Sequence, residues 1–234
     1  VHVEGNVDPI RDIETINLEL IFSDLETLEK RMDKAMKLKR SGDKTAQAEY
    51  DLMERIKAHL EAGFPVRTFD ATEEEEEVIR GLFLLTSKKV LYAANISEED
   101  LMSGEENDLV KRVREYIKDE NAGLVTICAR LEEELSGLED DEKLEMLAEY
   151  GINETGLDRL IKESYRLLGL MSFLTAGPQE IRAWTIKVGT KAPVAAGKIH
   201  SDIQRGFIRA EVISYDALME SGSEAHAKEK GLYR

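Results

Sequence analysis

The chain has 234 residues, of which 42% are hydrophobic, enough to build one large domain or two smaller ones around real cores. A formal net charge of −16 argues against general nucleic-acid binding, and DNA is not an expected partner. No run of about 18 apolar residues and no signal-peptide pattern occurs, which argues against a membrane span, and the single cysteine, Cys128, favours a reducing, cytoplasmic location.

Two amphipathic helices are expected first. Residues 13–40 carry apolar side chains at alternating spacings of four and three residues, which predicts a long helix with a narrow apolar seam. These side chains are Ile21, Leu25, Leu28, Met32 and Ala35. The stretch Arg40-Ser41-Gly42-Asp43 interrupts the pattern, and a second helix then runs to Gly63. We expect the two helices to pair as an antiparallel, coiled-coil-like hairpin about 30 Å long.

An acidic run, Glu73–Glu77, follows Thr72. Thr72 and Glu75 have the spacing of a capping box, and carboxylates are favoured at the positive end of a helix dipole. The run therefore predicts the start of a helix that reaches about Leu85, in preference to an acidic interaction patch.

A strand, a helix and a second strand come next. Lys88–Asn95 and Gly123–Ala129 are short apolar runs, and a helix is expected between them over about Asp108–Lys118. This order predicts a right-handed parallel unit buried on both faces. Parallel strands present functional groups at their carboxyl ends, so Asn95 and Glu98 are expected to share a cleft with the loop that begins at Cys128.

The tetrapeptide Asn95-Ile96-Ser97-Glu98 permits two interpretations. P-loop GTPases place Asn-Lys-x-Asp at this kind of position, and the Asp takes the ring N–H and the exocyclic amine of guanine. Ile96 lacks the stacking cation and Glu98 displaces the carboxylate, so guanine selectivity should be lost. Ser97 followed by acidic residues is equally a normal helix start, in which a hydroxyl caps the helix and the acids favour its dipole.

The composition changes after Gly169. Residues 169–234 contain nine Lys/Arg and seven Asp/Glu, a net charge of +2, which leaves −18 for residues 1–168. Such a shift predicts a domain boundary near Gly169.

A small sheet is expected in this C-terminal part. Met171–Thr175 and Glu180–Val188 predict a β-hairpin with a turn at Ala176-Gly177-Pro178. A helix from Thr190 to about Gln204 and a further strand over Phe207–Ser214 should complete the module.

Basic side chains gather in the same part, where they form either a face that contacts the phosphates of RNA or an ordinary solvated surface. They are Lys187, Lys191, Lys198, His200, Arg205 and Arg209. The four histidines are far apart in the sequence and share no metal-ligand spacing, so we predict no metal site.

Three stretches closely resemble the YchF or Obg-like ATPase family. They are Asp8–Leu20, Thr175–Gly177 with Glu180–Thr185, and Ala195–Asp202 continuing through Gly206–Ala210. The resemblance covers essentially the whole chain. It implies an α/β fold with the C-terminal part of a P-loop NTPase parallel sheet in residues 1–12 and 86–168. In this arrangement a helical hairpin, residues 13–85, interrupts the sheet, and a TGS domain of the ubiquitin-like β-grasp type follows in residues 169–234.

The resemblance also implies what the site binds. Asn-x-x-Glu in place of Asn-Lys-x-Asp is this family's base-recognition signature and goes with a preference for ATP over GTP. The base-contacting residues are then Asn95, Ile96, Glu98, Cys128 and Ala129. The implied parent protein is a cytoplasmic, GTPase-like hydrolase that uses ATP and Mg²⁺ and engages the ribosome, at the large subunit or through ribosomal RNA.

The sequence contains no phosphate-binding Gly-x-x-x-x-Gly-Lys-Ser/Thr loop and no magnesium-binding Asp-x-x-Gly. We therefore expect a fragment that begins after those elements, ends inside the TGS domain, and carries neither catalytic residues nor Mg²⁺ ligands. Such a fragment should bind nucleotide weakly and should not hydrolyse it, because phosphoryl transfer depends on phosphate positioning and metal charge. The alternative is a nucleotide-independent adaptor that binds the ribosome, RNA or protein through the hairpin and the TGS domain.

Overall fold

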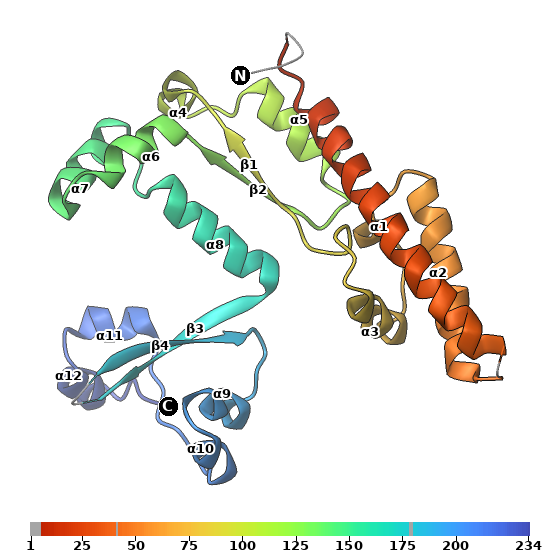
Figure 1. The fold of residues 1–234 in the computed structure, drawn as a ribbon. Helices are drawn as coiled ribbons and strands as arrows, with labels where there is room; N and C mark the ends of the chain where they lie inside the picture. Colours follow the sequence, from red (N-terminus) through yellow and green to blue (C-terminus); the bar gives the residue numbers. More distant parts are fainter. Residues whose placement is uncertain (1–5, 41, 178–179) are drawn as a thin grey trace. The chain divides into compact units, whose positions relative to one another are not determined.

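The computed structural model describes residues 6–40, 42–177 and 180–234, and the chain divides into two compact units, residues 1–168 and residues 169–234 (Figure 1). The first unit combines a helical hairpin with a two-stranded sheet and its covering helices. The second contains a two-stranded sheet and short helices. Within the described residues, no helix is long and apolar enough to cross a membrane.

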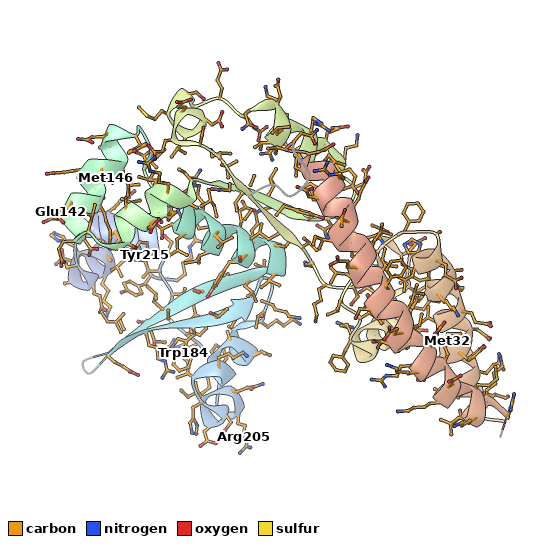
Figure 2. All side chains as sticks on the ribbon, turned by 45° about the horizontal axis from the view of Figure 1, so that its top comes forward. Met32, Glu142, Met146, Trp184, Arg205 and Tyr215 are labelled. Carbon is orange, nitrogen blue, oxygen red and sulfur yellow. The ribbon has the colours of Figure 1, made fainter. Side chains whose placement is uncertain are left out.

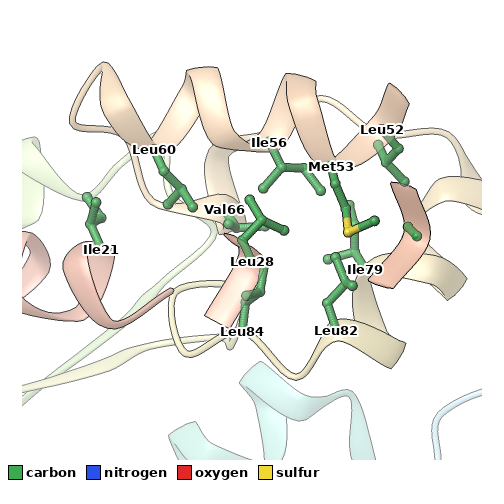
Figure 3. Packing of buried hydrophobic residues seen from close by; sticks show 11 residues of the cluster. Ile21, Leu28, Leu52, Met53, Ile56, Leu60, Val66, Ile79, Leu82 and Leu84 are labelled. Carbon is green, nitrogen blue, oxygen red and sulfur yellow. The ribbon is translucent and has the colours of Figure 1, made fainter. Parts of the chain in front are cut away.

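The helical hairpin consists of α1 (Pro9–Arg40) and α2 (Lys44–Glu61). Lys39 Nζ lies 3.3 Å from Asp51 Oδ1, and Lys57 Nζ lies 2.8 Å from Glu29 Oε1. The two helices therefore run antiparallel, as predicted. The expected seam is confirmed, because Ile21, Leu28 and Ala35 are buried and Leu25 and Met32 pack against the same cluster. Figure 3 shows how the side chains of α1 and α2 meet in this core.

A short 3₁₀ helix, η1 (Val66–Thr68), and helix α3 (Glu73–Leu82) close the open side of the hairpin core. Thr72 and Glu75 form the predicted capping box, in which each side chain accepts a hydrogen bond from the other residue's backbone N–H. The helix ends earlier than expected, because Phe83 adopts a left-handed conformation with a φ of 58°. This turn places Leu84 in the core, where it is fully buried.

A buried carboxylate fastens α1 to the segment that leads into the sheet. Asp24 is 1% exposed, and its two oxygens accept hydrogen bonds from the backbone N–H of Leu85 at 2.6 Å and of Thr86 at 2.7 Å. The Thr86 hydroxyl in turn accepts a hydrogen bond from Val66 N–H at 3.0 Å. Buried N–H groups need partners, so Asp24 fixes the path of a segment about 60 residues away in sequence.

The sheet of the first unit pairs β1 (Leu91–Asn95) with β2 (Gly123–Ile127) in parallel. Between them lie α4 (Glu98–Ser103) and α5 (Asp108–Tyr116). After β2 the chain forms α6 (Ala129–Ser136), α7 (Asp140–Glu149) and α8 (Gly156–Leu168). A second core lies between α4, α6 and α7; it contains Leu101, Cys128, Leu131, Leu135 and Leu147.

The second unit begins with an antiparallel hairpin of β3 (Leu170–Ala176) and β4 (Ile181–Lys187), as predicted. Trp184 Nε1 donates a hydrogen bond to the hydroxyl of Thr175 on the facing strand at 2.9 Å. The expected turn at Ala176-Gly177-Pro178 lies partly outside the described residues, because Pro178 is not among them.

Two expectations for the rest of this unit are wrong. The helix predicted over Thr190–Gln204 is divided into α9 (Ala192–Ile199) and α10 (Ser201–Arg205), because His200 is extended and its Nδ1 accepts the N–H of Asp202 as a cap. The predicted strand Phe207–Ser214 is not a strand. Val212 instead exchanges two backbone hydrogen bonds of 3.0 Å with Arg234 across α11 (Tyr215–Ser221) and α12 (Glu224–Glu229).

Replacing Asp24 with alanine should lower the free energy of unfolding by about 2 to 4 kcal/mol, because two buried N–H groups lose a charged acceptor. Urea denaturation measures the loss, and hydrogen exchange should show lost protection at the amides of Leu85 and Thr86. Asp33→Ala, an exposed change on the same helix, should have an effect within about 0.5 kcal/mol. Equal effects of the two substitutions would contradict the fastening role of Asp24.

Candidate functional site

The carboxyl ends of β1 and β2 meet at one edge of the sheet. Asn95, the last residue of β1, lies opposite Ile127, the last residue of β2. The Asn95 side-chain oxygen Oδ1 accepts the backbone N–H of Ala129 at 3.0 Å, and Ile96 N–H donates to Ile127 O at 2.9 Å. The two loops that we expected to share a cleft are therefore joined directly by hydrogen bonds.

The amide of Asn95 is exposed, and its Nδ2 has no hydrogen-bond partner in the described part of the chain. Because Oδ1 is held by Ala129, the orientation of the amide is set and Nδ2 remains available as a donor. Asn95 can thus present a fixed N–H to a ligand at the edge of the sheet.

Glu98 is the first residue of α4, and the structure separates its role from that of Ser97. The Ser97 hydroxyl caps the helix by accepting the N–H of Asp100 at 3.1 Å. The carboxylate of Glu98 instead reaches Tyr150, whose hydroxyl donates to Oε2 at 3.3 Å, and Arg130, whose Nε lies 3.0 Å from Oε1. The helix-start interpretation is therefore right for Ser97, while the Glu98 side chain is directed towards Arg130 on α6 and Tyr150 at the end of α7.

One carboxylate oxygen of Glu98 can accept a further hydrogen bond. Oε1 is buried, and although it forms an ion pair with Arg130, it accepts no well-aligned hydrogen bond from the described residues. The Arg130 side chain is 75% exposed and can rotate away at small cost. The Glu98 carboxylate raises the pKa of Arg130, and burial together with Glu98 raises the pKa of Tyr150. A donor group on a ligand would find an acceptor at Oε1.

The remaining residues of the predicted base site lie around the same loops with different roles. Cys128 is 3% exposed, and its side chain packs in the second core, so only its main chain borders the loop. Ala129 contributes its N–H, which is already bonded to Asn95. Ile96 is partly buried against the second core.

The start of β1 is held by a buried ion pair that sequence reasoning missed. The side chains of Arg67 and Glu120 are 5% and 12% exposed, and Arg67 Nη2 lies 3.0 Å from Glu120 Oε2. Tyr92 on β1 donates its hydroxyl to the same oxygen at 3.1 Å, and Asn17 on α1 accepts from Arg67 at 3.0 Å. No local pattern indicates a pair separated by 53 residues, and only the fold brings it together.

The six basic residues predicted as a surface all belong to the second unit and are all exposed. Lys187 ends β4, Lys191 precedes α9, and Arg205 ends α10. Asp202 Oδ2 lies 3.5 Å from His200 Nδ1, and Asp202 Oδ1 lies 3.6 Å from Arg205 Nη1. The negative charge of Asp202 partly offsets the positive charge at that end of the surface. Figure 2 shows Arg205 at the tip of its helix and Trp184 on the hairpin.

These features define an α/β protein with a helical hairpin, a parallel strand pair whose loops are joined at one edge, and a separate C-terminal unit. The chain resembles over its whole length a solved structure of the Schizosaccharomyces pombe YchF GTPase, with a TM-score of 0.81, 32% identity and coverage of 64% of that chain. Residues 170–234 match the family model YchF-GTPase_C, described as a protein of unknown function, DUF933.

Comparison with curated relatives also finds similarity to YchF and Obg-like proteins. The chain is 50% identical over 233 residues to the "Ribosome-binding ATPase YchF" of Bacillus subtilis and 41% identical over 236 residues to "Obg-like ATPase 1" of Caenorhabditis elegans. All of this chain is covered in both alignments, and it spans 64% and 59% of the two relatives. The chain is therefore homologous over its whole length to the YchF and Obg-like ATPase family.

The environment of Tyr92 makes a testable prediction about the strand that carries Asn95. Burial, reinforced by the Glu120 carboxylate, raises the pKa of Tyr92 from about 10 to about 12. Between these pH values the unfolded chain has lost a proton that the folded chain retains, so stability falls as the pH rises through this window. The tyrosinate absorbance of the wild type minus that of Tyr92→Phe should titrate near pH 12. A midpoint near 10 would contradict the buried network.

Proposed function

We propose that the chain is the base-recognition, helical-hairpin and C-terminal portion of a ribosome-associated ATPase that prefers ATP to GTP. The names of the relatives support the ribosome and ATPase parts of this proposal. The two-stranded parallel sheet is then part of a P-loop NTPase sheet, and residues 169–234 form a TGS-type module whose β-hairpin is followed by helices.

The observation that carries the proposal is the pair formed by Asn95 Nδ2, a free donor, and Glu98 Oε1, a buried acceptor without a hydrogen bond in the described chain. Along one edge, adenine offers the acceptor N7 beside the 6-amino donor, whereas guanine offers two acceptors, N7 and O6. A donor next to an acceptor-only carboxylate therefore complements adenine. Guanine would place its O6 against the carboxylate, which is unfavourable.

Glu98 has the support that such a role needs. Tyr150 donates to Oε2 and thereby leaves Oε1 directed towards Arg130 in the first turn of α6. An amino group of the base can replace the loosely held Arg130 at Oε1 without breaking a hydrogen bond. Asn95 is fixed at the same time by Ala129, so both groups are arranged before a ligand arrives.

We further propose that these 234 residues do not hydrolyse ATP by themselves. Phosphoryl transfer requires a phosphate cradle and metal ions that neutralise the developing charge. The sequence contains no phosphate-binding loop motif, and in the described part of the chain no group of three or more His, Cys, Asp or Glu side chains could hold a metal ion. The residues present fit the base of ATP and do not fit its Mg²⁺, so no metal-dependent step is assigned to them.

Titration of the isotope-labelled chain with ATP and GTP tests the base site. ATP should perturb the amides of Asn95 and Ala129 at concentrations where GTP does not, and Glu98→Gln should reduce the ratio of the two affinities about tenfold, because a charged acceptor is lost. Asn95→Ala should weaken the binding of ATP.

Glu99→Gln, an exposed change at the next position, is the matched control and should leave the ratio unchanged. Equal binding of ATP and GTP by the wild type, or equal effects of the two glutamine variants, would refute adenine recognition. Phosphate release measured on the same samples should stay at background. A magnesium-dependent rate that persists through further purification would contradict the second proposal.

The alternative, a nucleotide-independent adaptor, is favoured by the six exposed basic residues of the second unit. Binding of the chain to isolated large and small ribosomal subunits, measured over a range of salt concentrations with and without ATP, separates the two functions. The adaptor predicts steep salt dependence and no response to ATP. The combined variant Lys191→Glu and Lys198→Glu should then reduce the salt slope by about one unit per lost phosphate contact.

Lys111→Glu in the first unit is the control, because Lys111 is exposed and pairs with Asp108 on the same helix. If this change weakens ribosome binding as much as the double change in the second unit, the basic residues do not form the contact surface. A response of ribosome binding to ATP would favour the nucleotide-linked function.

A further inference from the structure

A cavity of about 500 Å³ lies in the first unit beside β2, within the range of about 300 to 1,000 Å³ that is typical of ligand pockets. It does not include Asn95, Glu98, Cys128 or Ala129. Its apolar lining comes from β2, from helices α4 and α5, and from the segments beside them: Ile96, Leu101, Val110, Leu124, Val125 and Ile152. Its polar lining comes from α4, α5 and the turn between them, from the segment before α8, and from α8 itself.

The cavity follows the free edge of β2. Leu124, Val125 and Thr126 are consecutive and all line it. Successive side chains of a strand point to opposite faces, so three consecutive residues border one cavity only when the cavity lies along the strand's edge. Within the residues described, β1 is the only strand paired with β2, so the opposite edge of β2 has no strand beside it.

The edge presents unused main-chain groups. Gly123 N–H donates to Val90 O, and Ile127 O accepts from Ile96 N–H, so the odd-numbered residues of β2 face β1. Main-chain groups alternate in direction along a strand, and those of Leu124 and Thr126 therefore point away from β1, at two residues that line the cavity. No backbone partner for them is found among residues 6–40, 42–177 and 180–234. Such a row of unpaired groups is a template for another strand.

One basic side chain beside this edge has a nitrogen without a hydrogen-bond partner in the described chain. Arg114 pairs with Glu106, and Lys162 pairs with Glu154. Arg159 also lines the cavity, and its Nε is buried without a hydrogen-bond partner in the described chain. A buried guanidinium nitrogen without a partner is costly, and a carboxylate is the group that satisfies it best.

The carboxylates around the cavity limit what can bind. Asp100 bonds to Ser97 and Asn107, and Glu163 pairs with Arg166. Glu105 also lines the cavity, so acidic side chains outnumber basic ones there. A ligand with several negative charges would be repelled, whereas a single carboxylate on a neutral backbone would not.

We propose that the free edge of β2 accepts an extended peptide segment, which adds to the sheet as a third strand and places one acidic side chain on Arg159. The outward groups of Leu124 and Thr126 are two residues apart, which is the repeat of an extended peptide. A small carboxylate can pair with Arg159 but cannot reach both positions on the strand. The groups that form this surface are separate from the Asn95 and Glu98 pair.

Titration of the isotope-labelled 234-residue chain with the capped peptide acetyl-TVEVT-amide tests the proposal. The amides of Leu124 and Thr126 should shift, and the peptide acetyl-TVQVT-amide should bind about tenfold more weakly because it lacks the carboxylate. Arg159→Gln should weaken binding of the acidic peptide by a similar factor. Arg112→Gln is the matched control, because Arg112 pairs with Asp8 and neither residue lines the cavity.

Two further probes distinguish strand addition from simple anion binding. An acetyl-TVEVT-amide with alternate N-methyl groups keeps the carboxylate but loses the N–H groups that face β2, and it should not bind. Glutarate should not produce the shifts at Leu124 and Thr126. The proposal is overturned if the acidic peptide causes no shift, if glutarate or the methylated peptide binds as well as the acidic peptide does, or if Arg159→Gln acts no more strongly than Arg112→Gln.

Discussion

The register of two five-residue parallel strands is the constraint on which the candidate site depends. Pairing Asn95 with Ile127 brings the ends of β1 and β2 level, so the Asn95 side chain meets the N–H of Ala129. A shift of one residue would turn Asn95 to the opposite face and break this hydrogen bond. The same register turns the main-chain groups of Leu124 and Thr126 away from β1. The hydrogen bond at the base-contacting end of the sheet and the unpaired edge of β2 thus both follow from the pairing of these two strands.

What holds that register lies at the other end of β1. Arg67 and Glu120 form a buried ion pair that also binds Tyr92 on the strand and Asn17 on α1. Such pairs contribute little net stability, because both charges lose their hydration, but breaking one partner is strongly unfavourable. Asp24 adds a second connection from α1 to the segment before β1. The hairpin and the strand that carries the site are therefore joined by polar contacts with strict geometry.

Local and periodic features of this fold could be predicted from the sequence. The α1 and α2 seam follows from a spacing of four and three residues, and the Thr72 cap follows from Glu75 three positions later. The nearness of the Asn95 and Ala129 loops followed from the expected parallel pairing. Such features depend on residues close in sequence or on one topological rule.

Contacts between distant side chains could not be predicted in this way. Glu98 is held by Tyr150, 52 residues later, and the orientation of that pair depends on where α7 ends. The break at His200 arose because a ring nitrogen competes for a backbone N–H, an option that helix periodicity does not reveal. The cavity beside β2 depends on how α5 and α8 flank an edge, which no residue pattern specifies.

Ile96 is the residue through which the two proposed sites meet. Ile96 lies between Asn95 and Glu98 in the chain, its N–H donates to the carbonyl of Ile127, and it is one of the residues that line the cavity beside β2. A strand added at that edge would pack against Ile96 and restrict the loop that orients Glu98. If the loop is already ordered, a nucleotide base binds at a smaller entropic cost. By linkage, nucleotide binding must then favour peptide binding by the same factor. The short segment after β1 can thus couple the two sites, so that binding at one changes the affinity of the other.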